Sequence, residues 1–80
     1  MTDNEYRLLR EALGCLPYTG TSIKEFARSV NLAPHTIYNY ISGQKPSDKT
    51  YRYILYTLTV NHSKAIEHAQ RIINMQEAKR

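Results

Sequence analysis

Between residues 35 and 42, five side chains away from the expected inner side of a helix can donate or accept hydrogen bonds without carrying a full charge. An asparagine amide can form two hydrogen bonds with the edge of an adenine, and His, Thr and Ser side chains can bond to base edges as well. The group therefore suits selective recognition through hydrogen bonds, and Asn39 is its strongest candidate. Its members are His35, Thr36, Tyr38, Asn39 and Ser42.

Basic residues flank this segment on both sides. Lys24 and Arg28 precede it, and Lys45, Lys49 and Arg52 follow it. The whole chain has 11 Lys and Arg against 7 Asp and Glu, a net charge of +4. Such a balance suits a polyanionic partner, either nucleic acid or an acidic protein surface. Charge alone leaves both partners open.

Other kinds of chemistry find little support in the sequence. Cys15 is the one cysteine, and its spacing from His35 and His62 fits no metal-ligand pattern. There is no glycine-rich phosphate loop, paired acidic site or nucleophile motif. We therefore expect a structural Cys15, no enzymatic activity, no cofactor and no small-molecule ligand. A single cysteine and the lack of an apolar run of about 20 residues indicate a cytoplasmic protein without a membrane span.

The elements that must position these residues are predicted to be helices. Apolar spacing predicts helices over 3–16, 23–30, 34–42, 48–59 and about 62–78, within a single domain of 80 residues and without strands. Ser22 to Glu25 has the form of a capping box, Asn31 and Gly43 suit left-handed helix ends, and Ser47 is a candidate N-cap. Asn61 or Ser63 is expected to cap the last helix.

The two C-terminal helices carry more apolar surface than one core face requires. Helix 48–59 has apolar residues on two sides, which predicts burial on more than one side. The apolar residues of the last helix that are expected to face inward are Ala65, Ile66, Ala69, Ile72 and Ile73.

Residues 22–42 have the layout of a helix-turn-helix, in which two short helices are joined by a tight turn. Five positions fit the packing of that motif jointly: Phe26, Ala27, Leu32, Ile37 and Tyr40. With these residues, segment 22–58 resembles the helix-turn-helix of the phage-repressor (Cro-like) family. Two positions depart from the family pattern, because Ile23 stands where many members have Gln and Asn31 replaces the turn glycine.

The resemblance implies a compact, lambda-repressor-like, all-α domain of five helices. It places residues 34–42 in the major groove as the recognition helix. Base contacts are then expected from Pro34 and from the hydrogen-bonding set at 35–42. Backbone contacts are expected from hydroxyl and basic residues around that helix, namely Thr21, Ser22, Lys24, Arg28, Lys45, Ser47, Lys49 and Arg52.

These observations together predict sequence-specific binding of double-stranded DNA by a transcriptional regulator, a repressor, of a bacterium, phage or mobile element. The alternative is a protein-binding module, such as a phage-encoded inhibitor, that uses the same fold against an acidic protein. A homodimer is expected, because one short recognition helix offers few contacts. Its predicted interface comprises Tyr53, Tyr56, Ile66, Ala69, Ile72 and Ile73; in the other interpretation, helix 62–78 folds entirely into the monomer core.

Overall fold

The computed structural model describes residues 3–78, and every regular element in that range is helical. The order is α1 (Asp3–Cys15), a 3-10 turn η1 (Leu16–Thr19), α2 (Ile23–Ser29), α3 (Pro34–Ile41), α4 (Asp48–Asn61) and α5 (Ser63–Ala78). The prediction of five helices without strands is confirmed for these residues. The predicted boundaries differ from the observed ones by one or two residues, as is usual for helix ends.

Hydroxyl side chains start α2 and α4. The Oγ atom of Ser22 accepts a hydrogen bond from the amide of Glu25 at 3.0 Å, and that of Ser47 accepts from the amide of Thr50 at 3.3 Å. Each bond satisfies an amide that has no partner inside its helix, which stabilises a helix start by about 1 kcal/mol. Both predicted N-caps are therefore confirmed.

Left-handed residues end α2 and α3. At the end of α2, Asn31 has φ 59°, and the amides of Asn31 and Leu32 bond to the carbonyls of Arg28 and Ala27 at 3.1 and 2.9 Å. The end of α3 closes in the same way at Gly43, with φ 119°. This paired pattern is a Schellman closure. At Asn31 this closure turns the chain sharply, so that α3 begins at residue 34, five residues after the end of α2 at Ser29.

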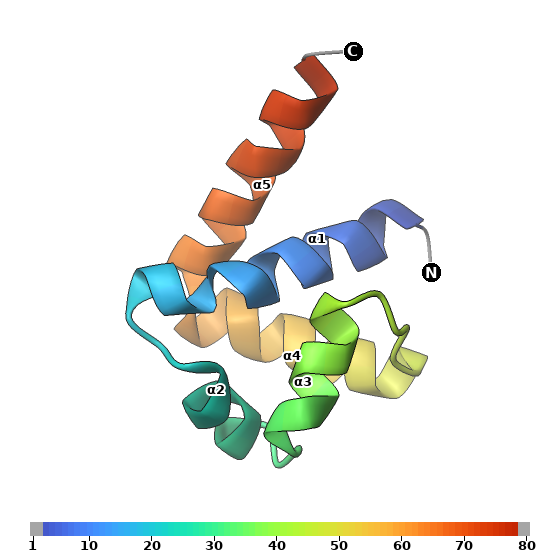
Figure 1. Cartoon of the computed structure of the whole chain (residues 1–80), viewed down its shortest axis with the longest axis vertical. Coiled ribbons are helices and arrows are strands. Elements are labelled where there is room, and N and C mark those ends of the chain that lie inside the picture. Colours follow the sequence, from blue (N-terminus) through green and yellow to red (C-terminus); the bar gives the residue numbers. More distant parts are fainter. Residues whose placement is uncertain (1–2, 79–80) are drawn as a thin grey trace.

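The core collects apolar side chains from all the helices. Figure 1 shows α1 crossing the middle of the molecule, α2 and α3 at one end, and the C-terminal part of α5 extending away at the other. α1 packs against α3, α4 and α5, and α2 packs against α3. The largest fully buried side chains are Leu9, Leu13, Leu16, Phe26, Ile37, Ile54 and Leu58.

One side of α4 is apolar and exposed, so within a single chain this helix is not buried on more than one side, although its two apolar sides predict such burial. Tyr53 is 50% exposed, Tyr56 67% and Val60 58%. The opposite side is buried through Tyr51, Ile54 and Leu58. Periodicity reveals that a helix has two apolar stripes, but only the neighbouring elements decide whether both are covered.

α5 packs on the core through small residues. Ala65 and Ala69 are fully buried, and Ile66 and Ile72 pack against the edge of the core. The helix follows α4 after a single residue, His62, whose carbonyl accepts from the amide of Ala65 at 3.0 Å. The residue that precedes α5 is therefore His62, and not Asn61 or Ser63 as expected, because α4 continues to Asn61 and α5 begins at Ser63. Within residues 3–78 no helix is both long and apolar enough to cross a membrane.

Candidate nucleic-acid interface

Four polar side chains form one exposed stripe along α3. His35, Tyr38, Asn39 and Ser42 are spaced i, i+3, i+4 and i+7, which places them on the same side of a helix. All four are exposed, and none forms a side-chain hydrogen bond with another residue of the range 3–78. We call these four residues the outer face of α3. Their donors and acceptors are free for a partner.

The other side of α3 fixes the helix on the body. Ile37 is fully buried, and Tyr40 is 8% exposed, as expected of core residues. Ile41 is half-buried and packs against the core. Thr36, which was predicted to contact bases, is half-buried and lies to the side of the exposed stripe. The outer face is thus presented by a helix whose orientation is set by burial of its inner side.

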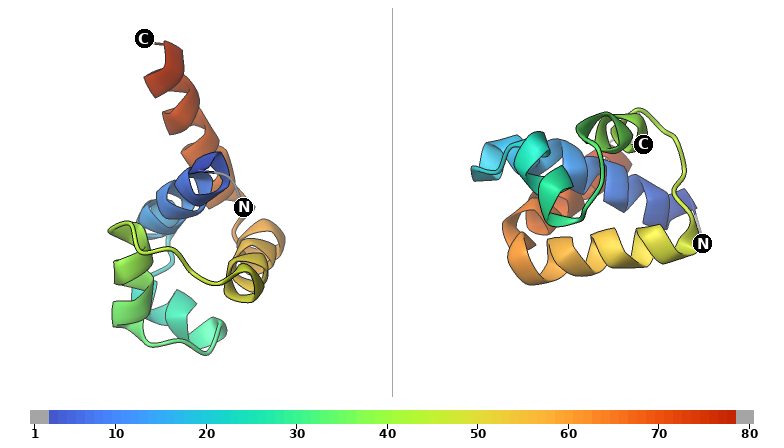
Figure 2. Two further views of the ribbon diagram at one scale, coloured as in Figure 1. Left: turned by 90° about the vertical axis from the view of Figure 1, so that its right-hand side faces the viewer. Right: turned by 90° about the horizontal axis from the view of Figure 1, so that it is seen from below.

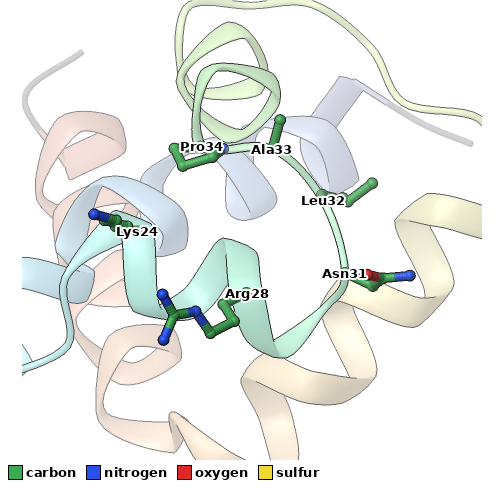
Figure 3. A pocket seen from close by; sticks show the side chains of 6 residues that line it. All are labelled: Lys24, Arg28, Asn31, Leu32, Ala33 and Pro34. Atoms are coloured by element: carbon green, nitrogen blue, oxygen red, sulfur yellow. The ribbon is translucent and has the colours of Figure 1, made fainter.

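A groove of about 450 Å³ separates the exposed side of α2 from the start of α3. Figure 3 shows Lys24 and Arg28 extending from the same side of α2, with the turn and Pro34 closing the opposite edge. We call this feature the basic groove. It borders the outer face of α3 at Pro34, which directly precedes His35. Its lining residues are Lys24, Arg28, Asn31, Leu32, Ala33 and Pro34.

Neither cation of the basic groove is paired with an acid within residues 3–78. Lys24 and Arg28 are four residues apart, so their charges lie near each other on one side of α2. Like charges in this relation destabilise an isolated helix by about 0.2 to 0.5 kcal/mol. An anion in the groove would relieve that repulsion.

No known protein family, curated protein or solved structure matches the chain. The role of this surface therefore has to be inferred from its own side chains.

The remaining residues predicted to contact a backbone lie in three places: at the start of α2, in the α3–α4 loop, where Lys45 is exposed, and at the start of α4. At the start of α2, Ser22 is exposed two residues before Lys24, whereas Thr21 is half-buried beside His62. Ser47, Lys49 and Arg52 are exposed at the start of α4, which lies on a different side of the body from α2 and α3 (Figure 2). None of these residues lines the basic groove.

His62 has contacts that the sequence did not reveal. Its ring packs edge-on against Phe26 with the ring centres 5.5 Å apart, and its Nδ1 lies 3.5 Å from Oγ1 of Thr21. Thr21 is half-buried there, so its hydroxyl is less accessible than that of Ser22. The junction of α4 and α5 thereby touches the start of α2. A contact over 41 residues leaves no trace in local spacing.

Cys15 is buried, as expected of a structural cysteine. Burial raises the pKa of its thiol, and the nearby Glu11 carboxylate adds to the effect. A neutral thiol is a poor nucleophile and metal ligand. No group of three or more His, Cys, Asp or Glu side chains within residues 3–78 could hold a metal ion.

Proposed function

We propose that the chain binds double-stranded DNA in a sequence-specific manner, with α2 and α3 acting as a helix-turn-helix and α3 lying in the major groove. The observation that supports this most is the outer face of α3. Four exposed, uncharged hydrogen-bonding side chains are aligned on one helix beside a groove with two unpaired cations. Base edges offer donors and acceptors at the spacing such a helix can reach.

Recognition and attraction are divided between two helices in this proposal. The outer face of α3 reads base edges, with Asn39 as the residue best suited to adenine. Lys24 and Arg28 bind backbone phosphates, which supplies affinity but carries no sequence information. The absence of lysine and arginine from α3 is then no obstacle, because the charge comes from its neighbour.

The biological role that follows is transcriptional regulation by occupancy of a site. A protein of this kind, bound at a promoter, blocks polymerase, as a repressor does. One copy presents a single short recognition helix, so two copies on successive half-sites would give useful affinity. The exposed Tyr53 and Tyr56 of α4 offer surface for pairing, and Ile73 of α5 is half-buried. Ala69 is buried in the chain's own core and offers none.

Binding to random-sequence duplex DNA over a range of salt concentrations tests the proposal. Phosphate neutralisation predicts that the logarithm of the binding constant falls linearly with the logarithm of salt, with a slope of several units. Lys24→Gln and Arg28→Gln should each reduce the slope by about one unit. Arg71→Gln is the matched control, because Arg71 is exposed on α5 and its loss changes the net charge equally.

The outcomes separate the two classes of partner. Binding that weakens with salt, and weakens further for the groove variants but not for Arg71→Gln, supports DNA as the partner. No binding to any duplex at low salt would overturn the proposal. In that case capture of an acidic protein surface, with the same loss in Lys24→Gln and Arg28→Gln, would favour the protein-binding alternative. Selection of bound duplexes from a random pool then reports base preference and half-site spacing together.

A further inference from the structure

The loop between α3 and α4 is attached to the first turns of α1 by one aromatic side chain. The hydroxyl of Tyr6 donates a hydrogen bond to the carbonyl of Pro46 at 3.4 Å. The ring of Tyr6 packs edge-on against Tyr51 of α4, with the ring centres 6.0 Å apart. Pro46 and Tyr51 are both buried. Tyr6 therefore joins three segments that are distant in the sequence, and Figure 2 shows the loop passing the N-terminal end of α1.

The same ring also contacts a cation. The Nζ atom of Lys45 lies 5.1 Å from the centre of the Tyr6 ring and 3.6 Å from Oδ1 of Asp3. A cation within about 6 Å of an aromatic ring is attracted by the ring's electron density. The Asp3 pair is open to water, since the Asp3 side chain is 97% exposed, and such pairs are weak.

These contacts hold the loop that follows α3 in the sequence. The loop begins at the Schellman closure of Gly43 and ends at Ser47, the N-cap of α4. Lys45 lies midway between them, and its position depends on how the loop is held. A lysine that is already ordered loses less side-chain entropy when it meets a phosphate than one that moves freely.

We propose that Tyr6 is a positioning residue for DNA binding, which holds the α3–α4 loop against α1 and presents Lys45 to the sugar-phosphate backbone beyond the end of the recognition helix. The inference rests on the proposed function, because it assigns Lys45 a phosphate as its partner. Phosphate displaces the Asp3 carboxylate, while the ring of Tyr6 keeps the lysine side chain in place. Tyr6 itself touches no nucleotide.

Two substitutions at Tyr6 separate the ring from the hydroxyl. Tyr6→Phe retains the ring beside Lys45 and loses the bond to Pro46, whereas Tyr6→Leu loses both. We expect Tyr6→Leu to weaken binding to random duplex about three- to tenfold and to reduce the salt slope by about one unit, the value for one phosphate contact. Tyr6→Phe should keep the slope and most of the affinity.

A cycle with Lys45→Gln shows whether Tyr6 acts through Lys45. In the Lys45→Gln background, Tyr6→Leu should leave the salt slope unchanged, because the lysine contact is already lost. Binding is measured well below the unfolding transition of each variant, so a loss of stability does not enter. A spectroscopic readout needs no DNA: the ring of residue 6 shifts the NMR signal of the Lys45 ε-methylene, and the shift should persist in Tyr6→Phe and vanish in Tyr6→Leu.

Each outcome decides a different question. If the unmodified chain binds duplex DNA and Tyr6→Leu binds with the same slope, Tyr6 has no positioning role and the inference is overturned while the proposed function stands. An equal slope loss from Tyr6→Leu with and without Lys45 would also overturn it. If the unmodified chain binds no duplex at any salt concentration, the proposed function fails and the assignment of Tyr6 fails with it.

Discussion

Asn39 is the exposed side chain on which the proposed base recognition depends most. It lies in the centre of the outer face of α3, and its side chain has no hydrogen bond to any other part of residues 3–78. A side chain without a role in the fold can be changed at little cost to stability. Any large effect of its removal on binding would then report on recognition itself.

Replacing Asn39 by alanine should therefore affect selected DNA far more than random DNA. Loss of a two-bond contact to a base should cost about 1 to 3 kcal/mol of binding free energy on the selected site and little on random duplex. Competition binding of Asn39→Ala with both duplexes measures the difference. Asn74→Ala, an exposed asparagine on α5, is the control. Equal losses on both duplexes would identify Asn39 as a backbone contact.

Cys15 and Tyr51 connect single residues to the effect of pH on stability. Burial raises the pKa of the Cys15 thiol from its ordinary 9.0, and burial followed by the Glu5 carboxylate raises that of the Tyr51 phenol from its ordinary 10.0. In both cases the folded chain holds its proton more tightly than the unfolded chain does. As pH rises past 9 and then past 10, the thiol and then the phenol lose their protons more readily in the unfolded chain than in the folded one. This difference lowers the free energy of unfolding.

We accordingly expect the free energy of unfolding to be constant with respect to these two groups near neutral pH and to fall above about pH 9. Cys15→Ala should make that alkaline decline shallower, and adding Tyr51→Phe should make it shallower still. Urea unfolding followed by circular dichroism across the alkaline range measures this. An unchanged decline in the double variant would show that other groups cause it.

At the scale of elements, the ends of α2 and α3 are set by single residues with positive φ. Asn31 adopts φ 59°, a conformation that costs most residues energy and glycine almost none. The turn between α2 and α3 therefore depends on the residue at this one position.

Substitutions at Asn31 should follow this backbone cost. Asn31→Gly should change the free energy of unfolding by no more than about 0.5 kcal/mol. Glycine adopts the left-handed conformation without strain, but it also gives the unfolded chain more conformational entropy, and the two effects oppose each other. Asn31→Ala should destabilise the chain by about 1 kcal/mol, because its Cβ is unfavourable in the left-handed region. Urea unfolding of the three proteins tests this order. A more stable Asn31→Ala would contradict the assigned turn geometry.

Local signals explain which elements could be predicted from the sequence. Ser22, Asn31, Gly43 and Ser47 each act through hydrogen bonds to nearby residues, and all four assignments agree with the structure. The 3-10 turn after α1 was missed, because Pro17 indicates only that an α-helix stops. The contact of Tyr6 with Pro46, 40 residues away, has no local signature in the sequence.

At the scale of the whole molecule, the sequence does not reveal whether the additional apolar residues of α4 and α5 are covered by the chain itself or remain exposed. Those of α5 pack largely on the chain itself, whereas Tyr53, Tyr56 and Val60 of α4 remain exposed. Spacing could not separate these cases, because an apolar stripe has the same pattern whether the chain covers it or not. The exposed stripe of α4 is the surface that a second copy could cover.

If two copies pair through this stripe, Tyr56→Ser should shift the protein toward monomers. We expect the dimer dissociation constant to rise about tenfold or more, as for removal of a central aromatic contact of about 1.4 kcal/mol or larger. Sedimentation over a range of concentrations measures it. Tyr18→Ser is the matched control, because Tyr18 is 86% exposed on η1, outside the proposed interface. A purely monomeric unmodified chain at high micromolar concentration, also on DNA, would refute the pairing.

The way α3 is held leaves its outer face unconstrained by folding. Its start and end are closed by backbone hydrogen bonds, and its attachment uses Ile37, Tyr40 and Ile41 on the opposite side. Positions 35, 38, 39 and 42 can therefore be randomised together in a combinatorial library while the scaffold is retained. Under the proposed function, the same separation would allow a lineage carrying this domain to drift from one target sequence to another by a few exchanges on a single helix.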